Sequence, residues 1–316
     1  TLLESGSALV AATSGIRKVR HTAPEEWFAD CPVTWRKSVP AMTDIFLEAV
    51  EKYLPGENYL TALTGGFDSR TLVAAGLFHG RTFTGYCFGS AQEGDLGMAA
   101  EISSRAGLPF VPVLLDSDYV RNESLEAGKE FITSSSGTGT FSRAHYIYAA
   151  SLLCNRSGYL VTGNFGSEVL RAVHSPGVMV SPLLYQVFQS DGPEEAVAIL
   201  KNSALLRFLS ADVADNETRN LEEVVSALPC FDVKYRGLGK NMQLYLFIFE
   251  ETFRKYFGSE ITGQWNRVIN RTPFLDCHFL RELFSTGLAG VHSGFMEGHP
   301  GRRFKGQILY ASVINR

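Results

Sequence analysis

The chain has 316 residues, of which 45% are hydrophobic and 20% are charged, so one large or two ordinary domains can bury a core and no sizeable part is compositionally disordered. The net charge of -4 argues against a general binder of nucleic acid or membrane surfaces, and no apolar run approaches the about 20 residues that span a membrane. The five cysteines are widely spaced without a C-x-x-C pair, which indicates neither a disulfide framework nor a zinc site and favours a reduced, cytoplasmic setting.

Strand-like and helical patterns alternate through the first half of the chain. Gly80 and Gly107 mark the expected ends of the first two helices. The predicted strands are 59–63, 82–88, 110–115 and 159–162, and the predicted helices include 69–79, 95–107 and 143–156. This alternation predicts an α/β fold with a doubly wound parallel sheet, whose binding crevice lies beyond the carboxyl ends of the strands.

The pattern changes after about residue 181. Helical spacing recurs in 194–209, 220–228 and 242–257, and no convincing strand separates these segments. We therefore predict an α/β core over 45–180 and an all-helical C-terminal extension over 181–316. The aromatic residues of the last segment are expected in the core, with a few of them lining a substrate pocket as the alternative.

A glycine-rich turn, TGGFDSR at 64–70, follows the first predicted strand. Gly65 and Gly66 let the backbone turn tightly and expose its amides, and the helix that follows adds free N–H groups and a positive dipole end. Asp68 is then placed to hold a hard cation against bound phosphates, and Ser69 to donate to a phosphate oxygen. The alternative is a structural turn in which Asp68 or Ser69 caps the helix.

The TGGFDSR turn resembles the S-G-G-x-D-S pyrophosphate loop of N-type ATP pyrophosphatases, and more closely that of the synthetase domain of the asparagine synthetase family. The segments VTGNFGSEVLR (161–171) and NRTPFLD (270–276) are similar to two further motifs of that family, and the resemblance covers roughly residues 45–315. It implies an adenine nucleotide alpha hydrolase-like fold. It also implies that ATP adenylates a small carboxylate, that pyrophosphate leaves, and that an amine donor then attacks to form an amide.

The resemblance also implies roles for single residues. The residues expected to hold the pyrophosphate are Thr64, Gly65, Gly66 and Ser69. Asp68 would bind Mg²⁺, while Phe88 and Gly163 would border the adenosine. ATP and Mg²⁺ are therefore the expected cofactors.

The chain departs from the family's motifs at several positions. Asn164 and Ser167 stand where the family has acids, and Ile269 replaces a third acid in the P-F-L-D block. Glu168 keeps the final acid and is the candidate to act as base and second metal ligand. Lys305 is a candidate phosphate partner, with a solvated surface lysine as the alternative reading.

Residues 1–44 resemble the tail that joins the family's glutaminase domain to its synthetase domain. They are interpreted as a linker remnant, so we expect this chain not to release ammonia from glutamine. A separate glutaminase domain or subunit is then a partner that the resemblance allows. Within this class the amine acceptor stays open between ammonia, an internal amine as in β-lactam synthetases, and a peptide as in lasso-peptide cyclases. A degenerate, non-catalytic nucleotide-binding or scaffold protein is the rival interpretation.

Overall fold

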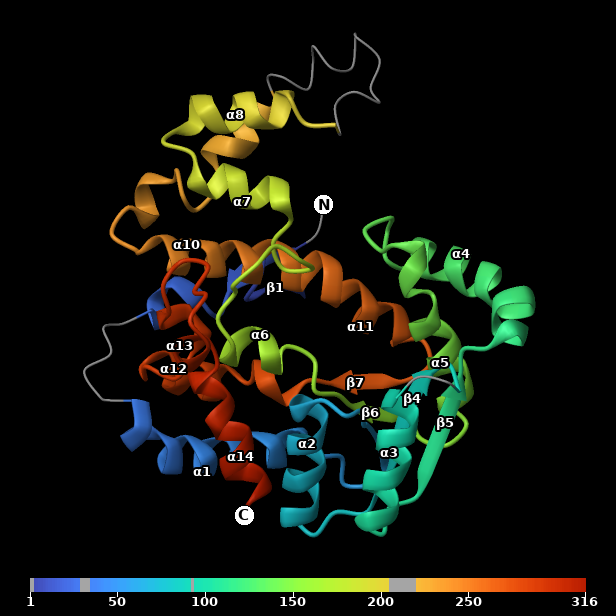
Figure 1. Cartoon of the computed structure of the whole chain (residues 1–316). Coiled ribbons are helices and arrows are strands. Elements are labelled where there is room, and N and C mark those ends of the chain that lie inside the picture. Colours follow the sequence, from blue (N-terminus) through green and yellow to red (C-terminus); the bar gives the residue numbers. More distant parts are fainter. Residues whose placement is uncertain (1–2, 29–34, 92–93, 205–219) are drawn as a thin grey trace. The chain divides into compact units, whose positions relative to one another are not determined.

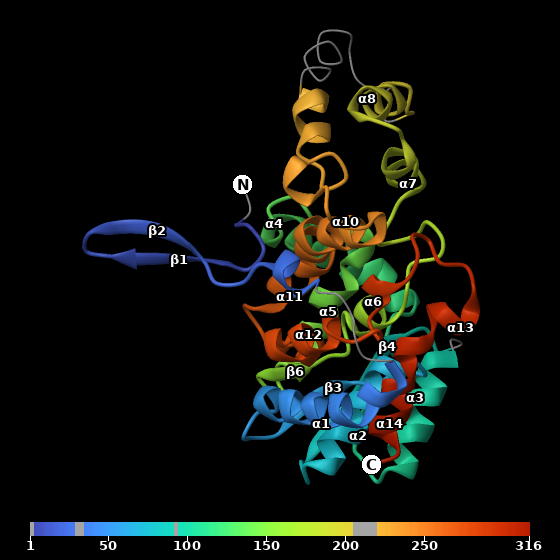
Figure 2. The ribbon, with the colours of Figure 1, turned by 90° about the vertical axis from the view of Figure 1, so that its left-hand side faces the viewer.

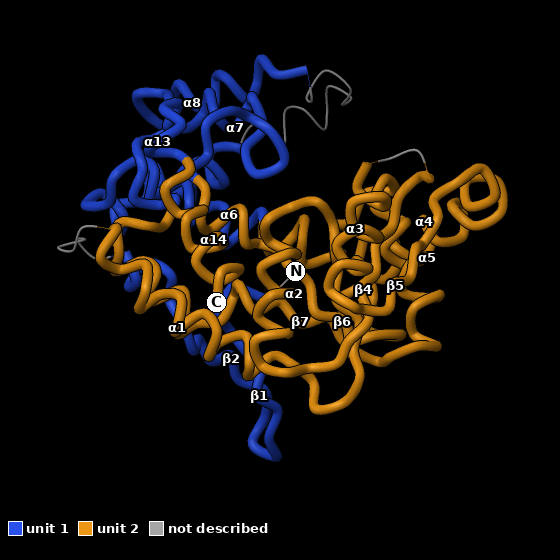
Figure 3. Tube along the Cα trace, turned by 60° about the horizontal axis from the view of Figure 1, so that its bottom comes forward, with its two compact units in different colours: residues 1–28, 172–252, 290–303 blue, residues 29–171, 253–289, 304–316 orange. Residues whose placement is uncertain are grey.

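The computed structural model describes residues 3–28, 35–91, 94–204 and 220–316. The chain forms two compact units (Figure 3). Unit 1 comprises Thr1–Phe28, Ala172–Thr252 and Gly290–Arg303, and unit 2 comprises Ala29–Arg171, Phe253–Ala289 and Phe304–Arg316. Each unit is thus assembled from separated stretches, whereas the sequence predicts three consecutive segments.

A five-stranded parallel sheet forms the centre of unit 2 (Figure 1). Its strands are β3 (Tyr59–Ala62), β4 (Phe83–Gly89), β5 (Phe110–Leu114), β6 (Tyr159–Val161) and β7 (Ile269–Arg271), in the order β5-β4-β3-β6-β7. Every neighbouring pair is parallel. The fold class predicted from the alternating pattern is confirmed, and four of the five strands lie where the sequence places them.

The fifth strand, β7, corrects the expectation that no strand follows residue 181. Its three residues pair with β6, with Tyr159 opposite Ile269 and Val161 opposite Arg271. The segment INR has no alternation of apolar and polar residues, and Pro273 follows closely, so it carries no strand signal. The strand lies at the edge of the sheet because it pairs with β6, which is far away in the sequence.

Helices cover both faces of the sheet, as the side-chain alternation along β4 shows. A Cβ atom on Gly85 would lie 2.9 Å from Ser103 Oγ in α3 (Gly94–Arg105), so this residue faces α3. The next residue, Tyr86, points to the other face, where it joins a buried cluster with Ala149 and Leu153 of α5 (His145–Leu153). Since successive strand residues point to opposite faces, α3 and α5 lie on opposite sides of a doubly wound sheet.

The helix α2 (Phe67–Phe78) packs on the same face as α3. A Cβ on Gly76 would lie 2.7 Å from the ring of Phe83, which stacks on Tyr59 at 5.2 Å. Both expected helix stops are confirmed, because Gly80 and Gly107 adopt φ angles of +62° and +65°, which favour glycine.

The remaining helical elements of unit 2 surround this sheet. They are α1 (Trp35–Tyr53), η2 (Tyr119–Glu123), α4 (Ser124–Ser134), η3 (Phe141–Arg143), α6 (Gly166–Leu170), α11 (Gly258–Gln264), η7 (Pro273–Leu275), α12 (Cys277–Phe284), η9 (Lys305–Gln307) and α14 (Ile308–Ile314). The helix α14 packs against both α1 and α2, which brings the end of the chain beside the TGGFDSR turn.

Unit 1 contains an antiparallel hairpin, β1 (Ser7–Ala12) and β2 (Gly15–Arg20), within the stretch interpreted as a linker (Figure 2). Arg20 at its base pairs with Glu25 at 3.1 Å. The helical elements of unit 1 are η1 (Pro24–Trp27), α7 (Pro182–Gln189), α8 (Pro193–Lys201), residues 220–226, η5 (Val233–Tyr235), α10 (Lys240–Phe247), the first part of η6 (Ile248–Phe257), η8 (Gly290–His292) and α13 (Pro300–Arg303). A small buried core joins α7, α8 and Val225.

Two features excluded by the sequence are also not found in the described part of the chain. None of its helices has the length and apolar character needed to cross a bilayer. No disulfide joins its four cysteines, Cys87, Cys154, Cys230 and Cys277, while Cys31 lies outside the described residues.

The turn before α14 generates a prediction about stability. A Cβ on Gly306 would lie 2.2 Å from the carbonyl oxygen of Leu170 and 2.6 Å from that of Leu288. Because both neighbours are backbone atoms, Gly306→Ala should destabilise the protein by about 1–3 kcal/mol. Denaturant unfolding measures this, with Gly158→Ala as the control, since no atom lies within 4 Å of its added Cβ. Equal stability of the two variants would contradict the close packing of this turn.

Candidate functional site

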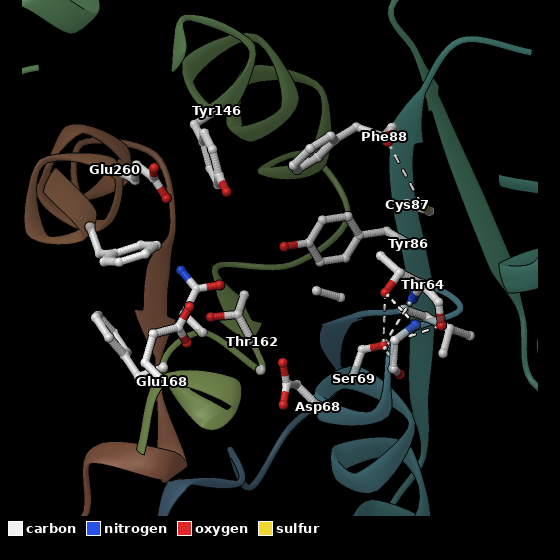
Figure 4. Close-up of a pocket in the computed structure, with 17 residues that line it drawn as sticks. Thr64, Asp68, Ser69, Tyr86, Cys87, Phe88, Tyr146, Thr162, Glu168 and Glu260 are labelled. Carbon is white, nitrogen blue, oxygen red and sulfur yellow. Dashed lines mark hydrogen bonds between the residues drawn. The ribbon is translucent and has the colours of Figure 1, made fainter. Parts of the chain in front are cut away.

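A cavity of about 260 Å³ opens at the carboxyl ends of β3, β4 and β6 in unit 2 (Figure 4). The chain leaves β3 toward β4 and β5 and then returns to β6 on the other side, so the winding reverses between β3 and β6. This reversal is where ligands bind in open α/β sheets. The lining residues are Ala62, Leu63, Thr64, Gly66, Asp68, Ser69, Tyr86, Cys87, Phe88, Tyr146, Thr162, Gly163, Asn164, Phe165, Glu168, Phe257 and Glu260.

The turn between β3 and α2 is held together by the hydroxyl of Ser69. Its Oγ accepts a hydrogen bond from the backbone N–H of Thr64 at 3.0 Å and lies 3.2 Å from the Thr64 hydroxyl. The same hydroxyl lies within donating distance of the carbonyls of Thr64 and Gly66. Ser69 is buried, so in this structure it organises the loop that surrounds the cavity.

The two glycines of this turn serve close approach and do not supply a left-handed backbone. Gly66 has φ −71°, and neither glycine is among the positive-φ residues of the described chain. A Cβ on Gly65 would lie 3.3 Å from Asp95 Oδ1, and one on Gly66 would lie 3.2 Å from Thr64 Oγ1. Neither glycine adopts a backbone conformation that favours glycine, and an added Cβ at either position would press on a neighbouring side chain.

The N-terminal end of α2 points its backbone amides at the cavity. No side chain caps this end of the helix, where Gly66 is the N-cap. The N–H of Gly65 donates to Asp95 Oδ1 at 3.2 Å, so a carboxylate already accepts from one amide of the turn. The N–H of Gly66 likewise donates to Thr64 Oγ1 at 3.1 Å. The first-turn amides of α2, which have no partner within the helix, and the positive end of its dipole favour an anionic ligand such as a phosphate.

Asp68 lies in the first turn of α2 and links it to two distant parts of the chain. Ser167 Oγ of α6 donates to Asp68 Oδ2 at 2.8 Å, and the Tyr310 hydroxyl of α14 donates to Asp68 Oδ1. Burial raises the pKa of Asp68, while these two hydroxyl donors and the charge of Arg171 act in the opposite direction. The carboxylate is therefore desolvated but well supplied with donors.

Glu168 contributes a second carboxylate to the same cavity (Figure 4). Burial raises its pKa, and the neighbouring charge of Asp68 raises it further, while its own backbone hydrogen bond and Arg171 lower it. Two buried acids that disfavour each other's charge fit a divalent cation, which needs only one or two carboxylates when phosphates complete its shell. The donor set thus suits Mg²⁺ bound together with a nucleotide, although the described residues contain no group of three metal-binding side chains.

The other end of the cavity is aromatic and contains a third acid. Figure 4 shows the side chains of Tyr86, Tyr146 and Glu260 directed toward the cavity, opposite the turn that carries Asp68. Glu260 is 1% exposed and forms an ion pair with Arg143. Burial raises the pKa of Glu260 to about 7, with Arg143 and Tyr146 acting in the opposite direction. A carboxyl with this pKa can exchange a proton near neutral pH.

Two glycines let the β6–α6 turn approach the β3–α2 turn. A Cβ on Gly163 would lie 2.9 Å from Asp68, and one on Gly166 would lie 2.7 Å from its Oδ1. Between them, Phe165 adopts φ +73°, a conformation that non-glycine residues rarely take, and its ring packs on Phe253 at 4.7 Å. The Ser167–Asp68 hydrogen bond shows that the turns after β3 and β6 face each other.

Most of the predicted site residues meet in this cavity. Those that line it are Thr64, Gly66, Asp68, Ser69, Phe88, Gly163 and Glu168, and Gly65 lies in the same turn. Lys305 is half-buried at the start of η9, outside the lining. Ile269 is half-exposed on β7. Asp276 caps α12 by accepting a hydrogen bond from the N–H of Phe279, so this residue of the P-F-L-D block stabilises a helix end.

Several charged and aromatic groups of the site were not recognised in the sequence. They are Tyr86, Arg143, Tyr146, Arg171, Glu260 and Tyr310. His145 lies half-buried against Phe88, with ring centroids 4.8 Å apart, and burial lowers its pKa to about 4. The sequence gave one indication of this end of the cavity, the alternative interpretation that a few aromatic residues of 242–257 line a substrate pocket. Phe257 of this segment does line the cavity.

Comparison with known proteins gives a similarity to solved structures alone. No family model and no curated protein matches the sequence. Among solved structures, the chain is similar to NMN synthetase from Francisella tularensis at 13% identity, with a TM-score of 0.28, over 78% of this chain and 94% of that one. The functional conclusion therefore depends on the residues of the cavity.

The carboxyl of Glu260 predicts a pH dependence of stability. Because its pKa is raised from 4.5 to about 7, the folded state binds more protons than the unfolded state between these values, and its contribution to stability falls as pH rises through them. Glu260→Gln should remove this fall, so the variant should gain about 2–3 kcal/mol relative to wild type from pH 5 to 8. Denaturant unfolding at several pH values measures the difference.

Glu130→Gln serves as the matched control for this experiment. Glu130 pairs with Arg267 through a half-exposed carboxylate, where ion pairs contribute little to stability. This variant should follow the pH profile of the wild type. If Glu260→Gln also keeps a constant offset from the wild type over this range, Glu260 does not carry the raised pKa.

Proposed function

We propose that the chain is an ATP-dependent, AMP-forming amide ligase of the asparagine synthetase type. It would adenylate a small carboxylate, release pyrophosphate and then pass the acyl group to an amine. The observation that carries the proposal is the meeting of the Thr64–Ser69 turn with Glu168 at the reversal between β3 and β6. The uncapped helix end and the two acids in one cavity suit the binding of a nucleoside triphosphate together with its cation.

The residues of the turn would bind and orient the pyrophosphate part of ATP. The backbone amides at the start of α2 would donate to phosphate oxygens, with Thr64 as a further hydroxyl donor. Asp68 and Glu168 would hold Mg²⁺, which supplies neutralisation of the phosphate charge. Phe88 and Gly163 would border the adenosine. Adenylation needs little beyond such positioning, so no covalent nucleophile is required of the protein.

The aromatic end of the cavity would receive the carboxylate and the amine. An attacking amine must lose a proton, and Asn164 leaves no acid at the family's candidate position for a base. Glu260, whose pKa is raised to about 7, is a carboxyl of the cavity lining that suits proton transfer near neutral pH, and burial also raises the pKa of Glu168. Ammonia, an internal amine and a peptide amine all remain acceptors that this chemistry accommodates.

A degenerate nucleotide-binding or scaffold protein is the second candidate. The observation that favours it is Ser167, which places a neutral hydroxyl against Asp68 where the family has an acid. With Asp68 and Glu168 alone, the cation would depend on the phosphates for most of its shell.

The first test addresses the turn itself. Asp68→Ala and Gly66→Val should each lower the affinity for ATP with Mg²⁺ by at least about tenfold, because one removes a metal ligand and the other presses a side chain on Thr64. Calorimetric titration measures the affinity. Asp44→Ala, at an exposed carboxylate that pairs with Arg316, and Gly97→Ala, in open space, are the controls. Unchanged affinity in both turn variants would exclude the phosphate site.

The second test separates the ligase from the degenerate protein. If Glu168 serves as metal ligand, Glu168→Gln should lower magnesium-dependent ATP binding by at least about tenfold. In a decayed site this change should do little, and Ser167→Asp should then strengthen metal binding by restoring an acid. Magnesium titrations of both variants decide the matter: no loss in the first together with a clear gain in the second would favour the degenerate protein.

A further inference from the structure

The hydroxyl of Tyr310 is a part of the site that the proposed reaction does not yet use. Tyr310 belongs to α14 and lies 242 residues after Asp68 in the chain, yet its hydroxyl donates directly to Asp68 Oδ1. Ser167 occupies the other oxygen of the same carboxylate at 2.8 Å. Both oxygens of the expected metal ligand are therefore fixed by neutral hydroxyl donors from two different helices.

Both donors are held rigidly. The side chain of Tyr310 is fully buried, and its ring lies parallel to Phe67 and edge-on to Phe274, with centroids 6.0 Å apart in each case. The α14 helix that carries Tyr310 starts beside Gly306, whose backbone is in close contact with two carbonyl oxygens. Ser167 belongs to the short helix α6, which follows the strained residue Phe165. Such support keeps a carboxylate in one orientation.

We propose that Tyr310 and Ser167 are positioning residues that clamp the Asp68 carboxylate in the orientation that binds the cation of ATP. This inference rests on the proposed function. A carboxylate has about four lone-pair positions, so two hydroxyl donors leave the remaining positions free for a metal ion. Without the clamp, the side chain of Asp68 can rotate, and Mg²⁺ tolerates poorly placed ligands badly. Ser167 stands where the family has an acid, and its hydroxyl orients the carboxylate of Asp68.

The test compares ATP binding with and without magnesium, by calorimetry. Tyr310→Phe removes one hydroxyl and keeps the packed ring, so it should weaken binding of ATP with Mg²⁺ by about tenfold, as expected for a lost hydrogen bond to a charged group. Binding of magnesium-free ATP should stay unchanged, because the amides of the turn are intact. Ser167→Ala should give the same split. The double variant should lose less than the sum of the two, since both bonds serve one carboxylate.

Tyr59→Phe is the matched control. Tyr59 is equally buried in unit 2 but lies at the amino end of β3, away from the cavity lining, so both affinities should match the wild type. If Tyr310→Phe does not fold, Ser167→Ala carries the same test.

Three outcomes would overturn the inference. Unchanged magnesium-dependent binding in both hydroxyl variants would show that the clamp does not position the metal ligand. An equal loss with and without magnesium would assign the hydroxyls to packing of the turn. A wild-type protein that binds no ATP with Mg²⁺ would remove the proposed function together with the inference, and this result differs from the first two because the wild type itself fails.

Discussion

The desolvated carboxylate of Asp68 is the constraint on which the site depends. A buried acid needs hydrogen-bond donors, and here they come from α6 and α14, which are far apart in the chain. The same residue requires the β6–α6 turn to approach closely, and glycine at 163 and 166 makes this possible, since a Cβ at either position would collide with Asp68. One side chain therefore determines residue types in two separate segments, 163–167 and α14.

The sheet could be predicted because its signals are local. Buried strands that alternate with helices, and glycine at the helix ends, gave four strands and the stops at Gly80 and Gly107 within a residue or two. The strand β7 had no such signal, because three residues at a sheet edge are fixed by pairing with β6. The stretch that forms the hairpin β1–β2 was interpreted as a linker because it resembles the tail between the family's two domains, although the two strands pair in a regular register.

The site, too, could be predicted only where its residues lie in local sequence patterns. The end of the cavity at Asp68 is formed by residues that come directly after β3 and β6. The motif at 64–69 and the residues near Glu168 could therefore be placed from the sequence. The other end is assembled from α5 and α11, whose residues carry no shared motif and meet only because both helices cover one face of the sheet. The ion pair between Arg143 and Glu260 spans more than a hundred residues and has no local pattern. Tyr310 was likewise not recognised, because its partner Asp68 lies 242 residues away and no local pattern links the two.

The two ends of the cavity favour different chemical groups of a ligand. The end at Asp68 combines helix amides with two acids, so it favours an anion most strongly when a cation accompanies it. The end at Glu260 combines one buried acid, one arginine and two tyrosine hydroxyls, and its net charge changes when that acid takes up a proton. A substrate that spans both ends would therefore carry phosphates at one side and a proton-exchanging group at the other. In the proposed reaction this polarity would suit an acyl adenylate approached by an amine, with Glu260 as the group whose charge changes near neutral pH.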